Sequence, residues 1–168
     1  MVGDKHKQLQ EKAIEWLYRR RCSVFDTEVT TWNGIADAVG VITKIFKDTG
    51  SYTSYYIEAK SSRSDLMCKK QKNCYNKTQE IDDNGKTIKD YSPYNYHDKY
   101  NDIDYFYFII ADGIKIDKDL YPTWGVIDER GKVIRRAKQM KKGRDCFELV
   151  NNIGHNLVYK VHGKLYLI

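Results

Sequence analysis

Two charged side chains close an otherwise apolar stretch of the sequence, "YYIEAK" at residues 55–60. In an extended strand, side chains two residues apart share a face, so Glu58 and Lys60 point to the same side. A third charged group, Asp37 in "IADAVG", lies in the preceding segment. A turn in "KDTGS" would place Asp37 opposite about residue 61 or 62. The three groups are therefore expected to converge at one edge of a sheet.

Two carboxylates and a lysine in this arrangement suit the hydrolysis of phosphodiesters. Mg²⁺ takes oxygen ligands and keeps several waters, so Asp37, Glu58 and the backbone carbonyl of Ala59 would suffice to hold it. Such a cation polarises a phosphoryl oxygen and lowers the pKa of a bound water. Lys60 would orient that water and stabilise the developing negative charge. The alternative is a surface ion pair worth about 0 to 1 kcal/mol with no function.

The segments that carry these residues predict a helix followed by three antiparallel strands. Apolar residues recur at helical spacing from Asp4 to about Arg21, with Asp4 as the expected N-cap. The segments "CSVFDTEVTTW", "IADAVGVITKIF" and "YTSYYIEAK" are rich in β-branched and aromatic residues. Turn formers separate them, "NG" at 33–34 and then "KDTGS". A second helix is expected at 63–76, with Ser61, Ser62 or Ser64 as its cap.

The rest of the chain predicts further strands around a buried centre. The continuous apolar run "IDYFYFIIADG" is typical of a strand buried on both faces, which places it at the middle of the sheet. "TWGVID" and "KVIRRA" predict a hairpin, residues 144–153 a short helix that ends at Gly154, and "LVYKVHGKLYLI" a last hairpin around His162 and Gly163. The polar, Tyr-rich stretch at 77–102 is expected to be an insertion or a flexible loop.

Length and composition favour one α/β domain over residues 1–168, since 168 residues with 41% hydrophobic content can bury a single core. The N-terminus has no apolar stretch and the longest apolar run, Tyr105–Ala111, is too short for a bilayer. We therefore expect no signal peptide, no membrane segment and a cytoplasmic location. The four cysteines show no CxxC spacing and suggest no disulfide framework.

Positive charge is concentrated in two tracts of a chain whose formal net charge is +6. Residues 132–144 contain seven basic side chains and no acidic one, and residues 69–77 contain four more. Tracts of this kind fit a surface that follows phosphates. Solvated faces that only keep the protein soluble are the alternative interpretation.

The chain contains, in order, Glu28, "ADAVG", "IEAKSSRSDL", a helix with Gln71 and Tyr75, and "DYFYFII". These motifs resemble the PD-(D/E)XK nuclease superfamily and, within it, the small MmcB-like group associated with DNA repair. The resemblance covers about residues 6–137, except for the insertion, and Ala36 stands where the motif often has proline. It implies a restriction-endonuclease-like core, a mixed sheet flanked by helices in αβββαβ order. It also implies a DNA endonuclease of repair, recombination or restriction type that depends on Mg²⁺ or Mn²⁺.

The resemblance also implies roles for individual residues. Asp37 and Glu58 would be the metal-binding carboxylates, Lys60 the catalytic lysine and Glu28 an acid close to the site that could add a ligand. Gln71 would be a further catalytic residue on the following helix, although its lysine neighbours could take that role. The residues expected to contact nucleic acid are Ser61, Ser62, Arg63, Lys69, Lys70, Lys72, Arg135, Arg136 and Lys138.

Several alternatives stay open at the level of sequence. A catalytically inactive nucleic-acid-binding module with the same fold is the main one, and an interaction protein whose charged residues are only surface is another. RNA as a substrate and a dimeric state are also open. The spacing of Cys68, Cys74 and His97 matches no common zinc pattern. Ordinary structural roles are expected for His6, His155 and His162, and the tyrosines at 91, 94, 96 and 100 could stack on bases or pack on the domain.

Overall fold

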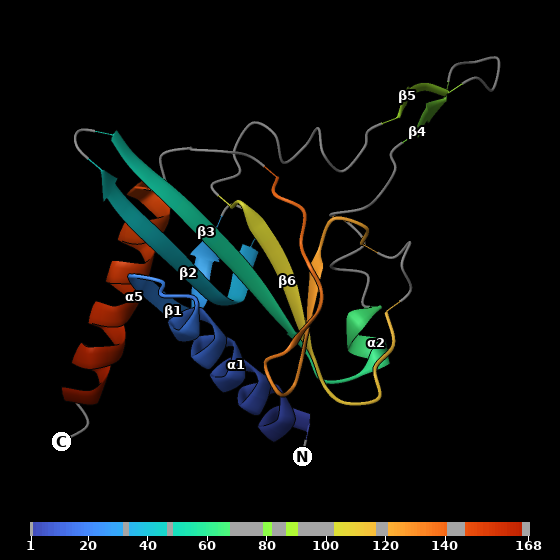
Figure 1. Cartoon of the computed structure of the whole chain (residues 1–168). Coiled ribbons are helices and arrows are strands. Elements are labelled where there is room, and N and C mark those ends of the chain that lie inside the picture. Colours follow the sequence, from blue (N-terminus) through green and yellow to red (C-terminus); the bar gives the residue numbers. More distant parts are fainter. Residues whose placement is uncertain are drawn as a thin grey trace.

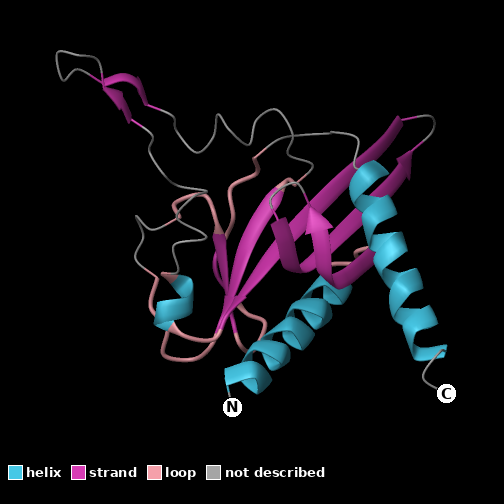
Figure 2. Ribbon diagram, turned by 180° about the vertical axis from the view of Figure 1, so that it is seen from behind, coloured by secondary structure: helices cyan, strands magenta, loops and turns pink. Residues whose placement is uncertain are grey.

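Six strands form one mixed sheet with a long helix on each face, so the predicted α/β class is confirmed (Figures 1 and 2). The computed structural model of the chain describes residues 2–31, 34–46, 49–67, 79–81, 87–90, 103–116, 121–140 and 147–165.

The strand order is β1-β2-β3-β6-β7-β8. Strands β1, β2 and β3 pair antiparallel with one another, as predicted, and β6 pairs parallel to β3. β6 lies inside the sheet and is almost entirely buried, as its continuous apolar run predicts. The predicted hairpin is the antiparallel pair β7 and β8. The strands span Val24–Thr31 (β1), Gly34–Phe46 (β2), Thr49–Lys60 (β3), Tyr105–Ile110 (β6), Gly125–Asp128 (β7) and Val133–Arg135 (β8).

Helix α1 (Val2–Arg19) covers one face of the sheet. Its buried side chains, Leu9, Ala13, Trp16 and Leu17, pack against β2, β3 and β6. The expected N-cap is wrong, because the helix begins at Val2 and Asp4 therefore lies in its first turn. A carboxylate there still interacts favourably with the helix dipole.

The opposite face is covered by helix α5 (Phe147–Leu165), which replaces the short helix and last hairpin that the sequence predicts. Leu149 and Ile153 lie one turn apart and are buried against the sheet. The helix continues through Gly154, where a Cβ would meet no atom within 4 Å. The hairpin prediction is wrong because a glycine inside a helix costs only about 1 kcal/mol and burial of the helix face outweighs it.

A short helix α2 (Arg63–Leu66) follows the end of β3 (Figure 1). Ser62 is its N-cap, since the hydroxyl accepts a hydrogen bond from the Asp65 N–H at 3.1 Å. The rest of the helix predicted at 63–76 lies outside the described residues. Within the predicted insertion, β4 (Gln79–Ile81) and β5 (Thr87–Asp90) form a separate antiparallel pair that the sequence did not predict. No helix among the described residues is long and apolar enough to cross a membrane.

Candidate active site

The pairing of β2 with β3 brings Asp37 to Glu58. The strands pair from Phe46 with Thr49 to Ala38 with Ile57, so the next residues in this register are Asp37 and Glu58. The predicted partner of Asp37, residue 61 or 62, is wrong because Thr49, Gly50 and Ser51 belong to β3 rather than to the turn. The turn ends before Thr49, earlier in the chain than predicted, so the register shifts and Asp37 lies directly opposite the "EAK" segment.

The carboxylate of Asp37 contacts both β3 and the first turns of α1. Its Oδ2 accepts a hydrogen bond from the Ala59 N–H at 2.8 Å. Its Oδ1 lies 3.0 Å from Nε2 of His6 and 3.3 Å from Nε2 of Gln10. The side chain of Asp37 is 18% exposed. Asp37 is therefore held at the edge between β2 and β3, with α1 on one side of it.

Glu58 and Lys60 share the face of β3 that is opposite to α1. One oxygen of Glu58 accepts a hydrogen bond from the Tyr56 hydroxyl at 2.6 Å, and the other lies 3.3 Å from Nζ of Lys60. Lys60 is only 5% exposed, and its Nζ is also 3.7 Å from Oδ1 of Asp65 on α2. The lysine therefore lies between two carboxylates.

Burial raises the pKa of Glu58 above its usual value of 4.5, and the negative charge of Asp37 raises it further. Lys60 and the hydroxyl of Tyr56 act in the opposite direction and offset part of this shift. Two carboxylates that repel each other in a partly buried site favour the binding of a cation, because the cation offsets both negative charges.

The backbone of Ala59 presents its carbonyl oxygen toward the same edge. In a strand, the N–H and C=O of one residue lie on the same side, and the Ala59 N–H is directed at Asp37. The carbonyl of Lys60 is on the other side, where it accepts a hydrogen bond from the Ala111 N–H at 3.0 Å. Two carboxylates and one carbonyl oxygen are thus near one another.

Glu28 lies opposite Asp37 in the pairing of β1 with β2, because the flanking pairs are Thr27 with Ala38 and Val29 with Ala36. Its φ is +55°, an uncommon conformation for a residue other than glycine. The side chain is exposed. Within the described part of the chain, no three His, Cys, Asp or Glu side chains form a metal-binding group. A Mg²⁺ ion that keeps several waters does not need three such ligands.

The residues after β3 have structural contacts of their own. The Ser61 N–H donates to Oδ2 of Asp65 at 3.3 Å, Ser62 caps α2, and Arg63 is exposed. Several residues assigned to the site or weighed for it lie outside the described residues: Cys68, Lys69, Lys70, Gln71, Lys72, Cys74, Tyr75 and His97. The same holds for the four tyrosines of the insertion.

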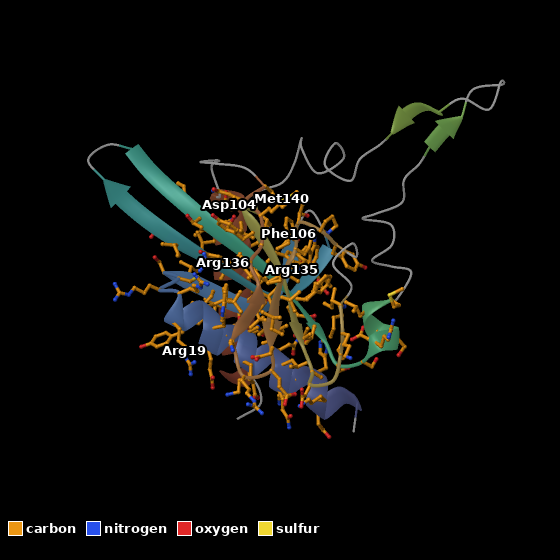
Figure 3. The ribbon with its side chains drawn as sticks, turned by 45° about the vertical axis from the view of Figure 1, so that its right-hand side comes forward. Arg19, Asp104, Phe106, Arg135, Arg136 and Met140 are labelled. Carbon is orange, nitrogen blue, oxygen red and sulfur yellow. The ribbon has the colours of Figure 1, made fainter. Side chains whose placement is uncertain are left out.

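Arg135, the last residue of β8, differs in its contacts from Arg136 and Lys138, although the sequence groups the three together. The guanidinium of Arg135 donates to the carbonyl oxygens of Trp124 at 2.9 Å and Tyr121 at 3.1 Å, so it supports the loop before β7. Arg136 and Lys138 are exposed. The segment after β8 ends where the Met140 N–H donates to the Asp104 carbonyl at 2.8 Å, and Figure 3 shows these two residues at one end of the sheet. Only two of the three side chains are therefore exposed, and the segment that carries them runs toward the start of β6, whereas Lys60 lies at the end of the parallel strand β3.

Four residues that contact the candidate site were not predicted. They are His6, Gln10, Tyr56 and Asp65. A sequence signal exists for the first two, because they extend the helical spacing of the buried positions 13 and 17 toward the N-terminus. Polar side chains on the buried stripe of a helix require polar partners.

Comparisons with known proteins add no relative. No protein-family model matches the chain, and no curated protein and no solved structure is significantly similar to it. A function for the chain is therefore inferred from the site residues and their geometry alone.

Proposed function

We propose that the chain is a metal-dependent endonuclease that hydrolyses phosphodiester bonds in DNA, of repair, recombination or restriction type. The observation that carries this proposal is the meeting of Asp37, Glu58 and Lys60 at one sheet edge. Asp37 bonds to the N–H inside the "EAK" segment at 2.8 Å, and its charge raises the pKa of Glu58. A surface ion pair without function would not require the second carboxylate.

The order of the elements supports a restriction-endonuclease-like core. Helix α1, the antiparallel strands β1 to β3, the short helix α2 and the parallel strand β6 occur in αβββαβ order, interrupted between α2 and β6 by the separate pair β4–β5. The motif residues lie at the end of β3 and beside the start of β2, where that core carries its active site. The added hairpin β7–β8 and helix α5 lie outside this order.

The donor set fits a divalent cation such as Mg²⁺ or Mn²⁺. Asp37 and Glu58 would hold it with the carbonyl oxygen of Ala59, which are hard oxygen ligands. Burial and the negative charge of Asp37 raise the pKa of Glu58, and a bound cation would oppose both effects. A bound cation supplies Lewis-acid polarisation of the phosphate and a more acidic water.

The protein side chains would orient the reacting groups. Lys60 is a compact positive charge, buried between Glu58 and Asp65 and suited to orienting water and to stabilising negative charge on the phosphate. Tyr56 holds one oxygen of Glu58. Exposed Arg63 at the start of α2 would contact phosphate, and the exposed Arg136 and Lys138 would add positive charge along a nucleic-acid strand.

One observation favours a second candidate, an inactive module that binds nucleic acid with the same fold. Both oxygens of Asp37 already have protein donors, and Lys60 is already engaged by two carboxylates. A site whose polar atoms already have protein partners can persist without a cation. The two candidates differ in cleavage but not in binding.

Cleavage of single-stranded, duplex and branched DNA in Mg²⁺ or Mn²⁺ distinguishes them. The wild type should cut at least one of these substrates, and Lys60→Ala and Glu58→Ala should not. The exposed pair Lys12 and Glu15, 2.9 Å apart, supplies the matched controls Lys12→Ala and Glu15→Ala, which should cut normally. Equal cleavage by all five proteins would refute the active-site assignment. Binding by all without cleavage by any would establish the inactive module.

A further inference from the structure

We propose that His6 and Gln10 are positioning residues, which hold the carboxylate of Asp37 in the orientation in which it shares a cation with Glu58. The inference rests on the proposed function, because it assigns these residues a task only if a cation binds there. The wider motif around Asp37 and Glu58 does not include them.

The two side chains act on one oxygen atom. His6 and Gln10 are four residues apart, so they lie side by side on one face of α1. The Nε2 atom of each is within 3.3 Å of Oδ1 of Asp37. A carboxylate oxygen accepts hydrogen bonds, so the contact is a hydrogen bond in the His6 tautomer that has its proton on Nε2. Two donors from one rigid helix thus converge on a single acceptor.

The helix that presents these donors is itself fixed. Leu9 and Ala13, on the same side of α1, are 1% and 0% exposed and pack against the sheet. The ammonium of Lys5 lies 2.7 Å from a carboxylate oxygen of Glu129 in the turn between β7 and β8. The first turns of α1 therefore cannot move away from β2 without loss of buried contacts. Sites on such rigid elements hold their ligands more precisely than sites on loops.

The geometry indicates why a second support is useful. The Ala59 N–H holds Oδ2 of Asp37 but leaves the carboxylate free to rotate about that contact. The donors on Oδ1 remove this rotation and fix the plane of the group. Oδ2 accepts only the Ala59 N–H and keeps lone-pair capacity for a cation, since a carboxylate offers about four acceptor sites, two on each oxygen. Loss of such supporting contacts typically weakens metal binding by about 10- to 100-fold.

The test measures Mn²⁺ binding to the metal-free full-length chain by titration calorimetry and by the loss of the free Mn²⁺ signal in electron paramagnetic resonance. His6→Ala and Gln10→Ala should each bind Mn²⁺ about 10-fold more weakly or worse. His6→Gln should bind nearly as well as the wild type, because an amide nitrogen replaces Nε2 as the donor. The matched controls are Gln8→Ala, an exposed glutamine on the same helix, and His155→Ala, an exposed histidine on α5.

Cleavage gives a second readout that a purely structural role would not produce. In His6→Ala and Gln10→Ala the Mn²⁺ concentration for half-maximal cleavage should rise, and the rate should recover at saturating Mn²⁺. If His6→Ala does not fold, His6→Leu keeps apolar volume without a donor and is compared with His6→Gln. Unchanged Mn²⁺ affinity in a wild-type-like background would overturn this inference and leave the proposed function intact. A wild type that neither binds Mn²⁺ nor cuts DNA would overturn both.

Discussion

Two acidic clusters on the same sheet differ in how their charges balance. On β1, the carboxylate of Asp26 lies 2.8 Å from Nζ of Lys160 and accepts a hydrogen bond from Asn156 at 2.9 Å. One carboxylate therefore faces one ammonium group, and the contact joins β1 to α5. The candidate site has Glu58 and Asp65 on either side of the single ammonium of Lys60, and a third carboxylate, Asp37, whose charge acts on Glu58. In the first cluster the two opposite charges neutralise each other without a ligand, whereas the second has an excess of negative charge.

The comparison separates a structural ion pair from a candidate site in residues of the same types. Both clusters contain a lysine bonded to a strand carboxylate, so the presence of such a pair does not distinguish them. Like charges at short range destabilise the folded protein unless a cation or substrate offsets them. An excess of one sign, rather than the presence of an ion pair, is therefore the feature that points to function.

The largest expected effect is on cleavage by Glu58→Gln. This change removes one carboxylate but keeps its shape, so cleavage should fall by about 10³-fold or more. Unfolding in urea should show that the metal-free variant is as stable as the wild type or more stable, because a repelled charge has been removed. Cleavage is measured under single-turnover conditions at saturating Mn²⁺. If the variant cut DNA at the wild-type rate, the negative charge of Glu58 would not contribute to catalysis.

Lys160→Met should have the opposite profile. It removes the ammonium that donates to Asp26 and to the carbonyl and hydroxyl of Thr27. The free energy of unfolding should fall by about 1 to 2 kcal/mol, a value at the lower end for charged hydrogen bonds because Lys160 is 36% exposed. Cleavage should stay within about threefold of the wild type. Lys138→Met, at an exposed position, should change stability by less than about 0.5 kcal/mol.

Loss of cleavage by Lys160→Met at unchanged stability would assign the Asp26–Lys160 pair to function rather than to folding, which would contradict the contrast between the two clusters. The same set of proteins thus tests both halves of the contrast.

The sheet could be predicted from sequence because its signals are local. Alternation, β-branched residues and the apolar run of β6 act over a few positions. The register of β2 and β3 could not, because the chain offers several turn-forming residues from Lys47 to Ser51 and the pairing depends on which of them belong to the strand. The resulting error changed the partner of Asp37 but not its meeting with the "EAK" segment.

Helix α5 was missed because half of its sheet-facing stripe is polar. Leu149, Ile153, Asn156 and Lys160 recur at helical spacing, but the last two face Asp26 and Thr27 rather than an apolar core. The β-branched and aromatic residues around Gly154 and Gly163 favour strands locally. Tertiary contacts with β1 outweigh that preference. His6 and Gln10 were missed for a similar reason, since their partner lies 31 and 27 residues away in the chain.

A smaller effect is expected for Tyr56→Phe, which removes only the hydroxyl that donates to Glu58 at 2.6 Å. The ring still packs against Phe106 and Trp124. The Mn²⁺ affinity should therefore weaken by roughly tenfold at nearly constant stability. Tyr55→Phe is the control, because Tyr55 is buried on the opposite face of β3 against Trp16. Equal affinities in the two variants would show that the hydroxyl of Tyr56 does not orient the carboxylate.

The smallest expected effect is a change of stability with pH in the metal-free protein. Because the pKa of Glu58 is raised, the folded chain retains a proton that the unfolded chain has already released. The contribution of Glu58 is therefore full below its usual pKa of 4.5 and is lost as pH rises through the raised value. Urea unfolding from about pH 4 to about pH 8 should show wild type losing stability relative to Glu58→Gln.

Glu129→Gln is the matched control for this pH series, and its trend should have the opposite sign. Lys5 and the Asp112 N–H lower the pKa of Glu129, so its contribution is present above the usual pKa and is lost as pH falls. Saturating Mn²⁺ should abolish the difference between wild type and Glu58→Gln that grows with pH, because a cation binds the ionised carboxylate. If this stability difference were the same with and without Mn²⁺, the ionised Glu58 would not bind the cation, which would contradict a metal site at this edge.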